Sequence, residues 1–200
     1  MTTWDARYDR AEYLFGTAPA TFLETHISRI PEGSSVLAIA DGEGRNSVFL
    51  AQAGHDVTAF DTSTVALQKA KDLAAQSGVA VSYHNAGIED WDWSRQFDAV
   101  VGIFIQFATP PQRDALFENM KRAVAPNGLV LLHGYRPEQV SYGTGGPPHA
   151  ENMYTDAMLE AAFAEFEILD LRSYDAVIEE GVGHSGRSAL IDLIARKPSQ

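Results

Sequence analysis

The sequence predicts an α/β fold in which a mostly parallel β-sheet lies between two layers of helices. Short runs rich in β-branched residues alternate with longer segments of helical periodicity through residues 33–134, a pattern typical of βαβ units. One of these runs, 98–104, is almost wholly apolar, as expected for a strand covered on both faces. Gly54 and Gly78 end the first two helical patterns. Right-handed crossovers would close these units into one Rossmann-like three-layer sandwich.

The first half of this sandwich is expected between residues 35 and 84. Strands are predicted over 35–40, 56–60 and 79–84, and helices over 45–53 and 63–77. Ser63 is the predicted N-cap of the second helix, because its hydroxyl can accept a hydrogen bond from a free backbone N–H. The apolar positions that predict the buried face of that helix are Val65, Ala66, Leu67, Ala70, Leu73 and Ala74.

The second half is expected to repeat the alternation and then to depart from it. The repeat consists of a strand over 97–104, a helix over 112–125 and a strand over 128–133. A glycine- and proline-rich loop over 136–152 follows, and a loop of this length is usually functional. A helix over 155–164 precedes two last strands, 166–177 and 188–195, which flank a glycine-rich turn at 180–183.

Composition and charge exclude several classes of function. The 200 residues include no cysteine, which excludes disulfides, thiolate zinc sites and a cysteine nucleophile. With 15 basic against 27 acidic residues, the net charge of −12 repels nucleic acids and anionic membranes. No apolar run reaches 18 residues, and the first ten residues are polar and charged, so neither a membrane span nor a signal peptide is predicted. A cytoplasmic protein is therefore expected.

A glycine-rich turn joins the first predicted strand to the first helix. Its glycines, Gly42 and Gly44, would let the backbone approach a ligand closely, and ligands of open parallel sheets bind beyond the carboxyl ends of the strands. Asp61 ends the second strand, 17 residues after Gly44, where it is placed to accept both hydroxyls of a ribose. This combination predicts an adenosine-containing ligand. The alternative is a tight turn followed by an exposed aspartate that caps the next helix.

Two residues near this turn distinguish among adenosine ligands. The dinucleotide fingerprint requires a glycine at position 47, where the sequence has Ser47. Glu43 would face a pyrophosphate with a second negative charge, whereas it suits a sulfonium ligand that carries an ammonium group. Arg45 is placed to reach a carboxylate, although an exposed arginine in the first turn of a helix is equally ordinary.

Residues 36–46 resemble motif I of the class I S-adenosylmethionine-dependent methyltransferases, and most closely the small tellurite-resistance-like and thiopurine-methyltransferase-like branch. Residues 57–61 resemble motif II, and 122–128 resemble a later turn of the family. The family's N-terminal segment is matched by Trp4-Asp5, by Arg7-Tyr8 and by residues 15–17. The resemblance thus extends along almost the whole chain.

The resemblance implies S-adenosylmethionine as the cofactor and a seven-stranded, mostly parallel sheet that ends in an antiparallel strand pair. It divides one domain, 1–200, into a cap segment (1–32), a cofactor-binding core (33–134), a lid loop (135–154) and a C-terminal helix and strand pair (155–200). The positions that it assigns to cofactor binding are Ala40, Gly42, Gly44, Asp61, Thr62, Gly87, Ile88, Gly102 and Phe104.

Three residues depart from the family pattern. Ala38 stands where relatives have an acidic residue, and Ala40 stands where they have glycine, so the ligand would sit slightly further out. Gly87 replaces the acidic residue common after the third strand, and Asp90 is the expected substitute as acceptor for the adenine amino group.

The acceptor side is expected in the loops at the carboxyl ends of the strands. Transfer from an activated methyl donor depends mainly on orientation, and a base is needed only for a protonated acceptor of high pKa. His133, at the end of the fifth strand, and Tyr135 are the catalytic candidates, although a histidine merely hydrogen-bonded at a strand end is an alternative for His133. The predicted substrate-binding residues are Tyr8, Phe15, Arg136, Tyr142 and His149. The spacing of the histidines predicts no metal site.

The function expected from these observations is in-line methylation of a small-molecule acceptor by S-adenosylmethionine, in a monomer or homodimer. Two alternatives stay open. Ala38 and Ala40 favour a catalytically silent protein that binds the cofactor or a metabolite, and Asp61 is also compatible with a nicotinamide-dependent oxidoreductase. Trp91 and Trp93 are expected to be buried under the edge of the sheet rather than to form a wall beside the adenine.

Overall fold

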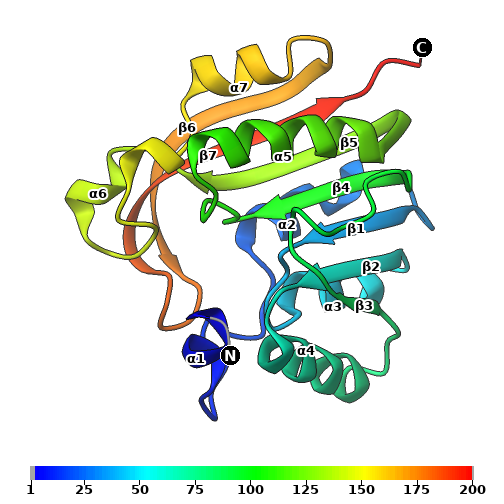
Figure 1. Cartoon of the computed structure of the whole chain (residues 1–200), viewed down its shortest axis with the longest axis vertical. Helices are drawn as coiled ribbons and strands as arrows, with labels where there is room; N and C mark the ends of the chain where they lie inside the picture. The colour runs from blue at the N-terminus through cyan, green and yellow to red at the C-terminus, as the bar shows by residue number, and fades with distance from the viewer. Residues whose placement is uncertain (1–2, 200) are drawn as a thin grey trace.

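A computed structural model describes residues 3–199, so residues 1, 2 and 200 of the predicted domain lie outside the described residues. Seven strands form one sheet in the order β3-β2-β1-β4-β5-β7-β6 (Figure 1). Strands β1 to β5 pair in parallel, whereas β7 is antiparallel to both of its neighbours. This arrangement confirms the predicted α/β class and the predicted C-terminal antiparallel pair.

The strands are β1 (Ser35–Ile39), β2 (Asp56–Asp61), β3 (Ser82–Asn85), β4 (Phe97–Ile103), β5 (Val124–Tyr135), β6 (Glu167–Glu179) and β7 (Ser185–Arg196). The α-helices are α1 (Thr3–Tyr8), α2 (Thr21–His26), α3 (Arg45–Gln52), α4 (Thr64–Gln76), α5 (Pro110–Ala123), α6 (Gln139–Tyr142) and α7 (Asp156–Ala162), and two 3-10 turns lie at Ile27–Arg29 and Ala150–Asn152. Within the described part of the chain, none of these helices is long and apolar enough to cross a membrane.

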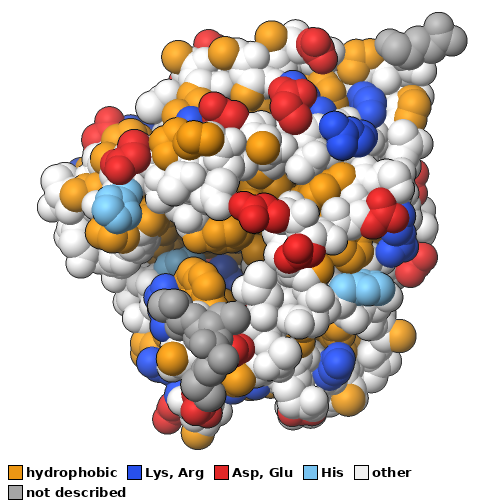
Figure 2. Space-filling view, in the orientation of Figure 1, with side chains coloured by type: hydrophobic (Ala, Val, Ile, Leu, Met, Phe, Trp, Pro, Cys, Tyr) orange, Lys and Arg blue, Asp and Glu red, His pale blue; other side chains and the backbone are white. Residues whose placement is uncertain are grey.

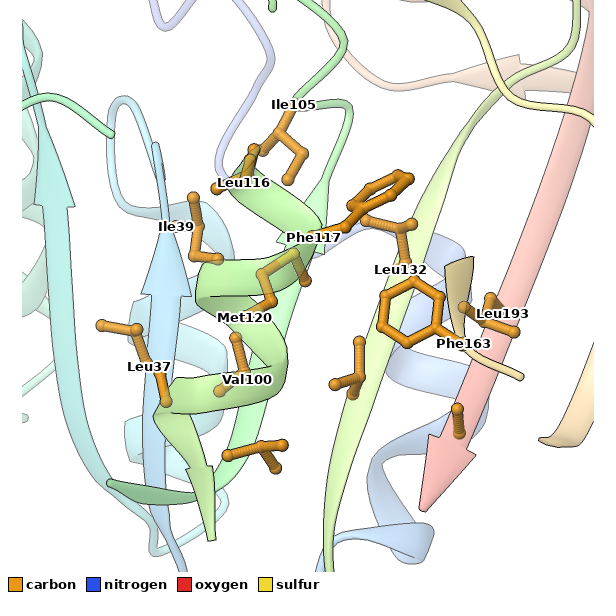
Figure 3. Close-up of a cluster of buried hydrophobic side chains, with 14 of the residues drawn as sticks. Leu37, Ile39, Val100, Ile105, Leu116, Phe117, Met120, Leu132, Phe163 and Leu193 are labelled. Atoms are coloured by element: carbon orange, nitrogen blue, oxygen red, sulfur yellow. The ribbon is translucent and has the colours of Figure 1, made fainter. Parts of the chain in front are cut away.

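Alternate side chains of the central strands supply two hydrophobic cores. Leu37 of β1 and Val100 of β4 face the side covered by α5 and α7, and Figure 3 shows α5 over this face with Leu116, Phe117 and Met120 beneath it. The neighbouring positions of the same strands face α2 and α3, where the second core forms. This alternation lets apolar strands be buried on both faces, as predicted.

The segment between β3 and β4 covers the sheet without a helix. Trp91 and Trp93 are buried in the core on the α5 side, where the Trp91 ring stacks on Phe60 with ring centroids 4.7 Å apart. Trp93 Nε1 donates a hydrogen bond of 2.9 Å to the Ile88 carbonyl. The expectation that both indoles are buried is confirmed.

Element boundaries differ from the prediction where proline or strand extension decides them. Helix α5 begins at Pro110, because Thr109 and Gln112 form a capping box and proline is tolerated where no N–H is needed. Strand β5 begins at Val124, so the predicted helix end at 125 was wrong. Strand β6 ends two residues later than predicted, and β7 begins three residues earlier. Strand β3 begins at Ser82 rather than 79. The predicted loop 136–152 contains the short helix α6 and a 3-10 turn.

The sheet order places a ligand site between β1 and β4. The chain runs outward from β1 to β2 and β3 and then returns to β4 on the other side of β1. At such a reversal the connections leaving the two central strands diverge and open a crevice beyond their carboxyl ends. The glycine-rich turn after β1 lies at this crevice.

Candidate active site

A cavity of about 610 Å³ opens at the carboxyl ends of the parallel strands, within the size range of small-molecule sites. One part of its wall comes from the turns after β1, β2 and β3, and includes Ala40, Gly42, Asp61, Thr62, Gly87, Ile88 and Asp90. The other part comes from the N-terminal segment, β4, β5 and the C-terminal loops, and includes Tyr8, Phe15, Phe104, Tyr135, His149 and His184. The cavity therefore brings together most of the predicted cofactor and substrate residues.

Asp61 joins the turns after β1 and β2. Its two carboxylate oxygens accept hydrogen bonds from the backbone N–H groups of Gly42 at 2.9 Å and Ser63 at 2.8 Å. The side chain is buried, and this burial raises the pKa of the Asp61 carboxyl, with the nearby Asp5 adding to the effect. Each carboxylate oxygen has lone pairs beyond the one used, so Asp61 can hold the glycine turn and still accept from a ligand.

Gly44 and Glu43 of the turn serve packing rather than the cavity surface. A Cβ at Gly44 would lie 2.7 Å from Ala70 Cβ, so this glycine lets α3 and α4 approach closely. Glu43 points under the N-terminal segment, where it accepts from the Leu14 N–H at 2.7 Å and pairs with Lys69 at 2.8 Å. The expectation that Glu43 faces the ligand is therefore not met.

Aromatic rings line the end of the cavity away from these turns. The His184 ring lies 4.4 Å from Phe15 and 4.2 Å from Phe104 between ring centroids, and Tyr135 lies 4.7 Å from Phe104. Phe104 has a φ of +54°, a conformation that costs a bulky side chain about 1–3 kcal/mol and that gathers at functional sites. The cavity therefore has an apolar, aromatic end in addition to the end formed by the glycine turn.

Comparison with known proteins agrees with this geometry. Residues 36–128 match a family described as a methyltransferase domain. A solved structure reported for the conversion of a disulfide bond into a thioacetal group during echinomycin biosynthesis superposes with a TM-score of 0.77 at 19% identity, covering 98% of this chain and 91% of that one. The N-methyltransferase NodS from Bradyrhizobium japonicum, in complex with S-adenosyl-L-homocysteine, superposes with a TM-score of 0.73 at 13% identity, covering 98% and 97%.

The match to a methyltransferase domain family over residues 36–128, together with the order of the sheet, supports the predicted resemblance to class I S-adenosylmethionine-dependent methyltransferases. The predicted tellurite-resistance branch is represented by TehB from Haemophilus influenzae, which has a TM-score of 0.67 and 18% identity over 88% of this chain and 61% of TehB. Two solved structures with this fold, NodS and the magnesium protoporphyrin IX methyltransferase ChlM from Synechocystis, hold S-adenosyl-L-homocysteine, the demethylated form of the predicted cofactor, S-adenosylmethionine. Among curated proteins, an uncharacterized protein of Mycobacterium bovis is 32% identical over 123 residues, or 60% of this chain and 44% of its own. The chain spans about half the length of the curated relatives it matches.

Two of the departures from the family pattern have a counterpart in the structure. Ala40 has a φ of +47°, a left-handed conformation that glycine adopts at less cost. Gly87 leaves room for Asp90, because a Cβ at position 87 would lie 3.3 Å from Asp90 Oδ2. The Asp90 carboxyl thus occupies the space that an acidic side chain at position 87 would enter, and it lines the cavity.

Of the two catalytic candidates, only Tyr135 lines the cavity. His133 faces the α2 side of the sheet, where its ring stacks on Phe22 and its Nδ1 lies 2.6 Å from Asp192 Oδ1. The Phe104 ring contacts His133 edge-on, with centroids 4.7 Å apart, and also lines the cavity. A catalytic role for His133 stays a prediction, and this geometry favours its hydrogen-bonded alternative.

Three further predicted residues do not line the cavity. Arg136 forms an ion pair of 2.5 Å with Asp175, and the Tyr142 hydroxyl donates to the same carboxylate at 2.7 Å, which places both on the outer side of β6. The lack of a side chain at Gly102 leaves room for Ile105, because a Cβ at position 102 would lie 2.6 Å from Ile105 Cδ1. Gln139 also holds the loop around Tyr142, because its side-chain N–H donates to the Gly145 carbonyl and its side-chain oxygen accepts from the Ala189 N–H. Its tip, 146–149, reaches the cavity, and so does Asn152 further along the chain.

Sequence analysis did not assign several residues that line the cavity. They include Asp41, Asn46, Gln106 and Asn152. Gln106 holds Tyr135 in place, because its side chain accepts from the Tyr135 N–H at 2.6 Å and donates to the Tyr135 carbonyl at 2.7 Å. Asp41 lies within the recognised glycine turn, so its position could have been found from the sequence. Acidic and basic side chains are interspersed on the face of the molecule in Figure 2.

The turn between β6 and β7 closes the cavity against the N-terminal segment. The Gly183 N–H donates to the Leu14 carbonyl at 3.1 Å. A Cβ at Gly181 would lie 2.5–2.6 Å from the backbone atoms Phe15 C, Gly16 N and Leu14 O. Only glycine permits this close approach of two backbones, so a glycine-rich turn predicted merely as a connection forms part of the cavity wall.

We expect Gly181→Ala to lower the free energy of unfolding by about 2–4 kcal/mol, because it adds a backbone clash to an unfavourable φ of +73°. Gly33→Ala is a matched control, since Gly33 has the same φ of +73° and no atom within 4 Å of its added Cβ. Urea denaturation of both variants measures the difference. Equal losses would mean that contact between the turn and residues 14–16 contributes nothing to stability.

Proposed function

We propose that this chain is an S-adenosylmethionine-dependent methyltransferase that transfers the methyl group in line to a small-molecule acceptor. The observation that carries the proposal is one cavity with two chemically different ends. The turns after β1, β2 and β3 supply glycines and carboxylates, and the aromatic rings of Phe15, Phe104 and Tyr135 supply the other end. Such a cavity can hold a charged nucleoside ligand and an apolar acceptor side by side.

The residues at the first end fit the cofactor. Asp41 Oδ2 is buried without a hydrogen-bond partner among residues 3–199, and Asp41 lines the cavity, which favours a ligand carrying positive charge. Asp61 would hold the ribose hydroxyls, and Asp90 would accept from the adenine amino group. When bound, S-adenosylmethionine supplies a methyl group activated on a positively charged sulfur.

The residues of the chain then have to orient the acceptor and exclude water. The N-terminal segment is tied over the glycine turn, because Glu43 accepts from the Leu14 N–H and Asn46 accepts from the Ala20 N–H at 3.0 Å. The tip of the loop, 146–149, borders the opposite side of the cavity. Enclosure of this kind holds the acceptor in the geometry for attack, from which most of the acceleration comes.

The protonation states of Tyr135 and His184, at the proposed acceptor end of the cavity, favour an acceptor whose attacking atom already has a free electron pair. Burial raises the pKa of the Tyr135 hydroxyl, with Glu180 adding to the effect, so Tyr135 acts as a hydrogen-bond donor at neutral pH. Burial, followed by the charge of Arg45, lowers the pKa of His184 to about 3, so its imidazole is neutral and weakly basic. We therefore propose that Tyr135 positions the acceptor and that neither group removes a proton of high pKa.

Calorimetric titration with three ligands tests the proposed function. We expect micromolar binding of S-adenosylmethionine and S-adenosylhomocysteine and no binding of NADH, because the turn lacks the third glycine of a dinucleotide site. Cofactor binding without methylation of any member of an acceptor panel would favour the silent binding protein instead. Failure of both adenosyl ligands to bind would overturn the proposed function.

A further inference from the structure

Besides Asp41 Oδ2, three buried polar atoms on cavity-lining residues have no hydrogen-bond partner among the described residues. They are Arg45 Nη1, Tyr135 Oη and His184 Nδ1. Ser188 neighbours Tyr135 Oη and opposes the rise in the pKa of that hydroxyl, but no hydrogen bond of normal geometry joins the two side chains. A buried donor without a partner typically costs about 1–3 kcal/mol, and a charged one costs more. All three atoms belong to residues that line one cavity, which points to a ligand that satisfies these atoms when it reaches them.

Arg45 is held in place by a residue far along the chain. Its Nη2 donates to Glu180 Oε2 at 2.7 Å, and both side chains are 7% exposed. The other carboxylate oxygen of Glu180 accepts from the Thr21 N–H at 3.2 Å. Glu180 therefore fixes the guanidinium and leaves its Nη1 available. A planar guanidinium with a fixed free N–H is suited to an oxyanion.

Charge is distributed unevenly along the cavity wall. The lining carboxylates Asp41, Asp61, Glu89 and Asp90 all come from the turns after β1, β2 and β3. The lining residues from β5, from 146–152 and from the turn before β7 include no carboxylate within the described residues. Arg7 and Arg45 both lie close enough to His184 to lower the pKa of its imidazole. Glu180 offsets the charge of Arg45, so this end carries no excess of negative charge, and an anionic acceptor is repelled less here than beside the carboxylates of the other end.

We infer that the acceptor is a small aromatic or similarly apolar carboxylic acid. Its carboxylate would accept from Arg45 Nη1 and Tyr135 Oη, and its apolar body would lie against Phe15 and Phe104. This inference rests on the proposed function and specifies the substrate class of the same site. The neutral His184 adds a polar contact without adding charge.

Three aromatic probes of similar size and different charge test the substrate class. Benzoate, benzamide and benzylammonium are titrated calorimetrically into the chain saturated with S-adenosylhomocysteine. We expect benzoate to bind at least tenfold more tightly than benzamide, and benzylammonium to bind more weakly than either. Equal affinities, or a preference for benzylammonium, would overturn the inference.

Variants assign the preference to the residues named. Tyr135→Phe removes one donor without changing the ring, and the double change Arg45→Gln with Glu180→Gln removes the arginine without leaving a buried glutamate unpaired. Each should reduce the preference for benzoate over benzamide at least threefold. Arg136→Gln is the control, because Arg136 pairs with Asp175 outside the cavity and should leave the preference unchanged. An unchanged preference in the Tyr135 and Arg45 variants would overturn the assignment.

Benzoate is also titrated in the absence of S-adenosylhomocysteine, and comparison with the saturated chain shows whether the two ligands compete. This separates failure of the inference from failure of the proposed function. Competition between benzoate and S-adenosylhomocysteine would mean that Arg45 serves the carboxylate of the cofactor, and this would overturn the inference while leaving the proposed function in place. Failure of S-adenosylhomocysteine to bind would instead overturn the proposed function, whatever benzoate does.

Discussion

Replacing Asp61 with alanine is expected to weaken binding of S-adenosylmethionine by a factor of at least 100. Asp61 is placed to accept two ribose hydroxyls, and a hydrogen bond to a charged group contributes about 1.5–3 kcal/mol. Loss of two such bonds amounts to about 3–6 kcal/mol, and each 1.4 kcal/mol corresponds to roughly a tenfold change in affinity. Calorimetric titration of the native chain and the variant measures the ratio directly.

Two further measurements make the Asp61 prediction specific. Asp61 also accepts from the N–H groups of Gly42 and Ser63, so the alanine variant could lose affinity because the glycine turn moves. Asp61→Asn keeps one acceptor oxygen and the side-chain shape but loses the charge, and we expect its affinity to lie between those of the native chain and the alanine variant. Benzoate binding should survive in both variants. Unchanged cofactor affinity in Asp61→Ala would remove Asp61 from the site.

The fold could be predicted from sequence because its signals are local. Ser63 illustrates this, since its hydroxyl accepts from the Ala66 N–H at 3.1 Å as the N-cap position predicts. The apolar run that became β4 is buried on both faces, as its composition indicates. The end of the cavity that we propose for the cofactor could also be predicted from the sequence, because the turn after β1 and Asp61 at the end of β2 lie close together in the sequence and in space.

The acceptor end could not be predicted because it is built from contacts between distant residues. Arg45 and Glu180 are 135 positions apart, and no periodicity or motif links them. His133 and Tyr135 both end β5, yet only Tyr135 lines the cavity, because the register of β5 with β7 places His133 against Asp192. Arg136 and Tyr142 lie in a loop with the expected composition, but an ion pair and a hydrogen bond to Asp175 hold them outside.

Asp41 is expected to make the stability of the ligand-free chain depend on pH. Burial raises the pKa of its carboxyl from 3.8 to about 7, with hydrogen bonding to Ser47 opposing the shift. Between these two values the folded chain keeps a proton that the unfolded chain has released, so the free energy of unfolding falls as pH rises. Three pH units at 1.36 kcal/mol each set an upper limit of about 4 kcal/mol on this loss.

Asp41→Asn removes the titration and should therefore stabilise the ligand-free chain at pH 8 by about 2–4 kcal/mol while leaving its stability at pH 4 nearly unchanged. Urea denaturation at both pH values measures this, with the exposed Asp56→Asn as the control for loss of one charge. A gain of the same size at pH 4 and pH 8 would show that ionisation of Asp41 is not the cause.

The same carboxyl connects stability to cofactor binding. A cationic ligand beside Asp41 favours its ionised form, so binding of S-adenosylmethionine near pH 7 should release a proton from the native chain and none from the asparagine variant. Calorimetry in two buffers of different ionisation enthalpy counts this proton. The Asp41 carboxyl, which has no ion-pair partner, costs the chain stability at neutral pH. A positively charged ligand best explains why this carboxyl is present, because its charge would contribute nothing in a cavity that is empty or binds a neutral ligand.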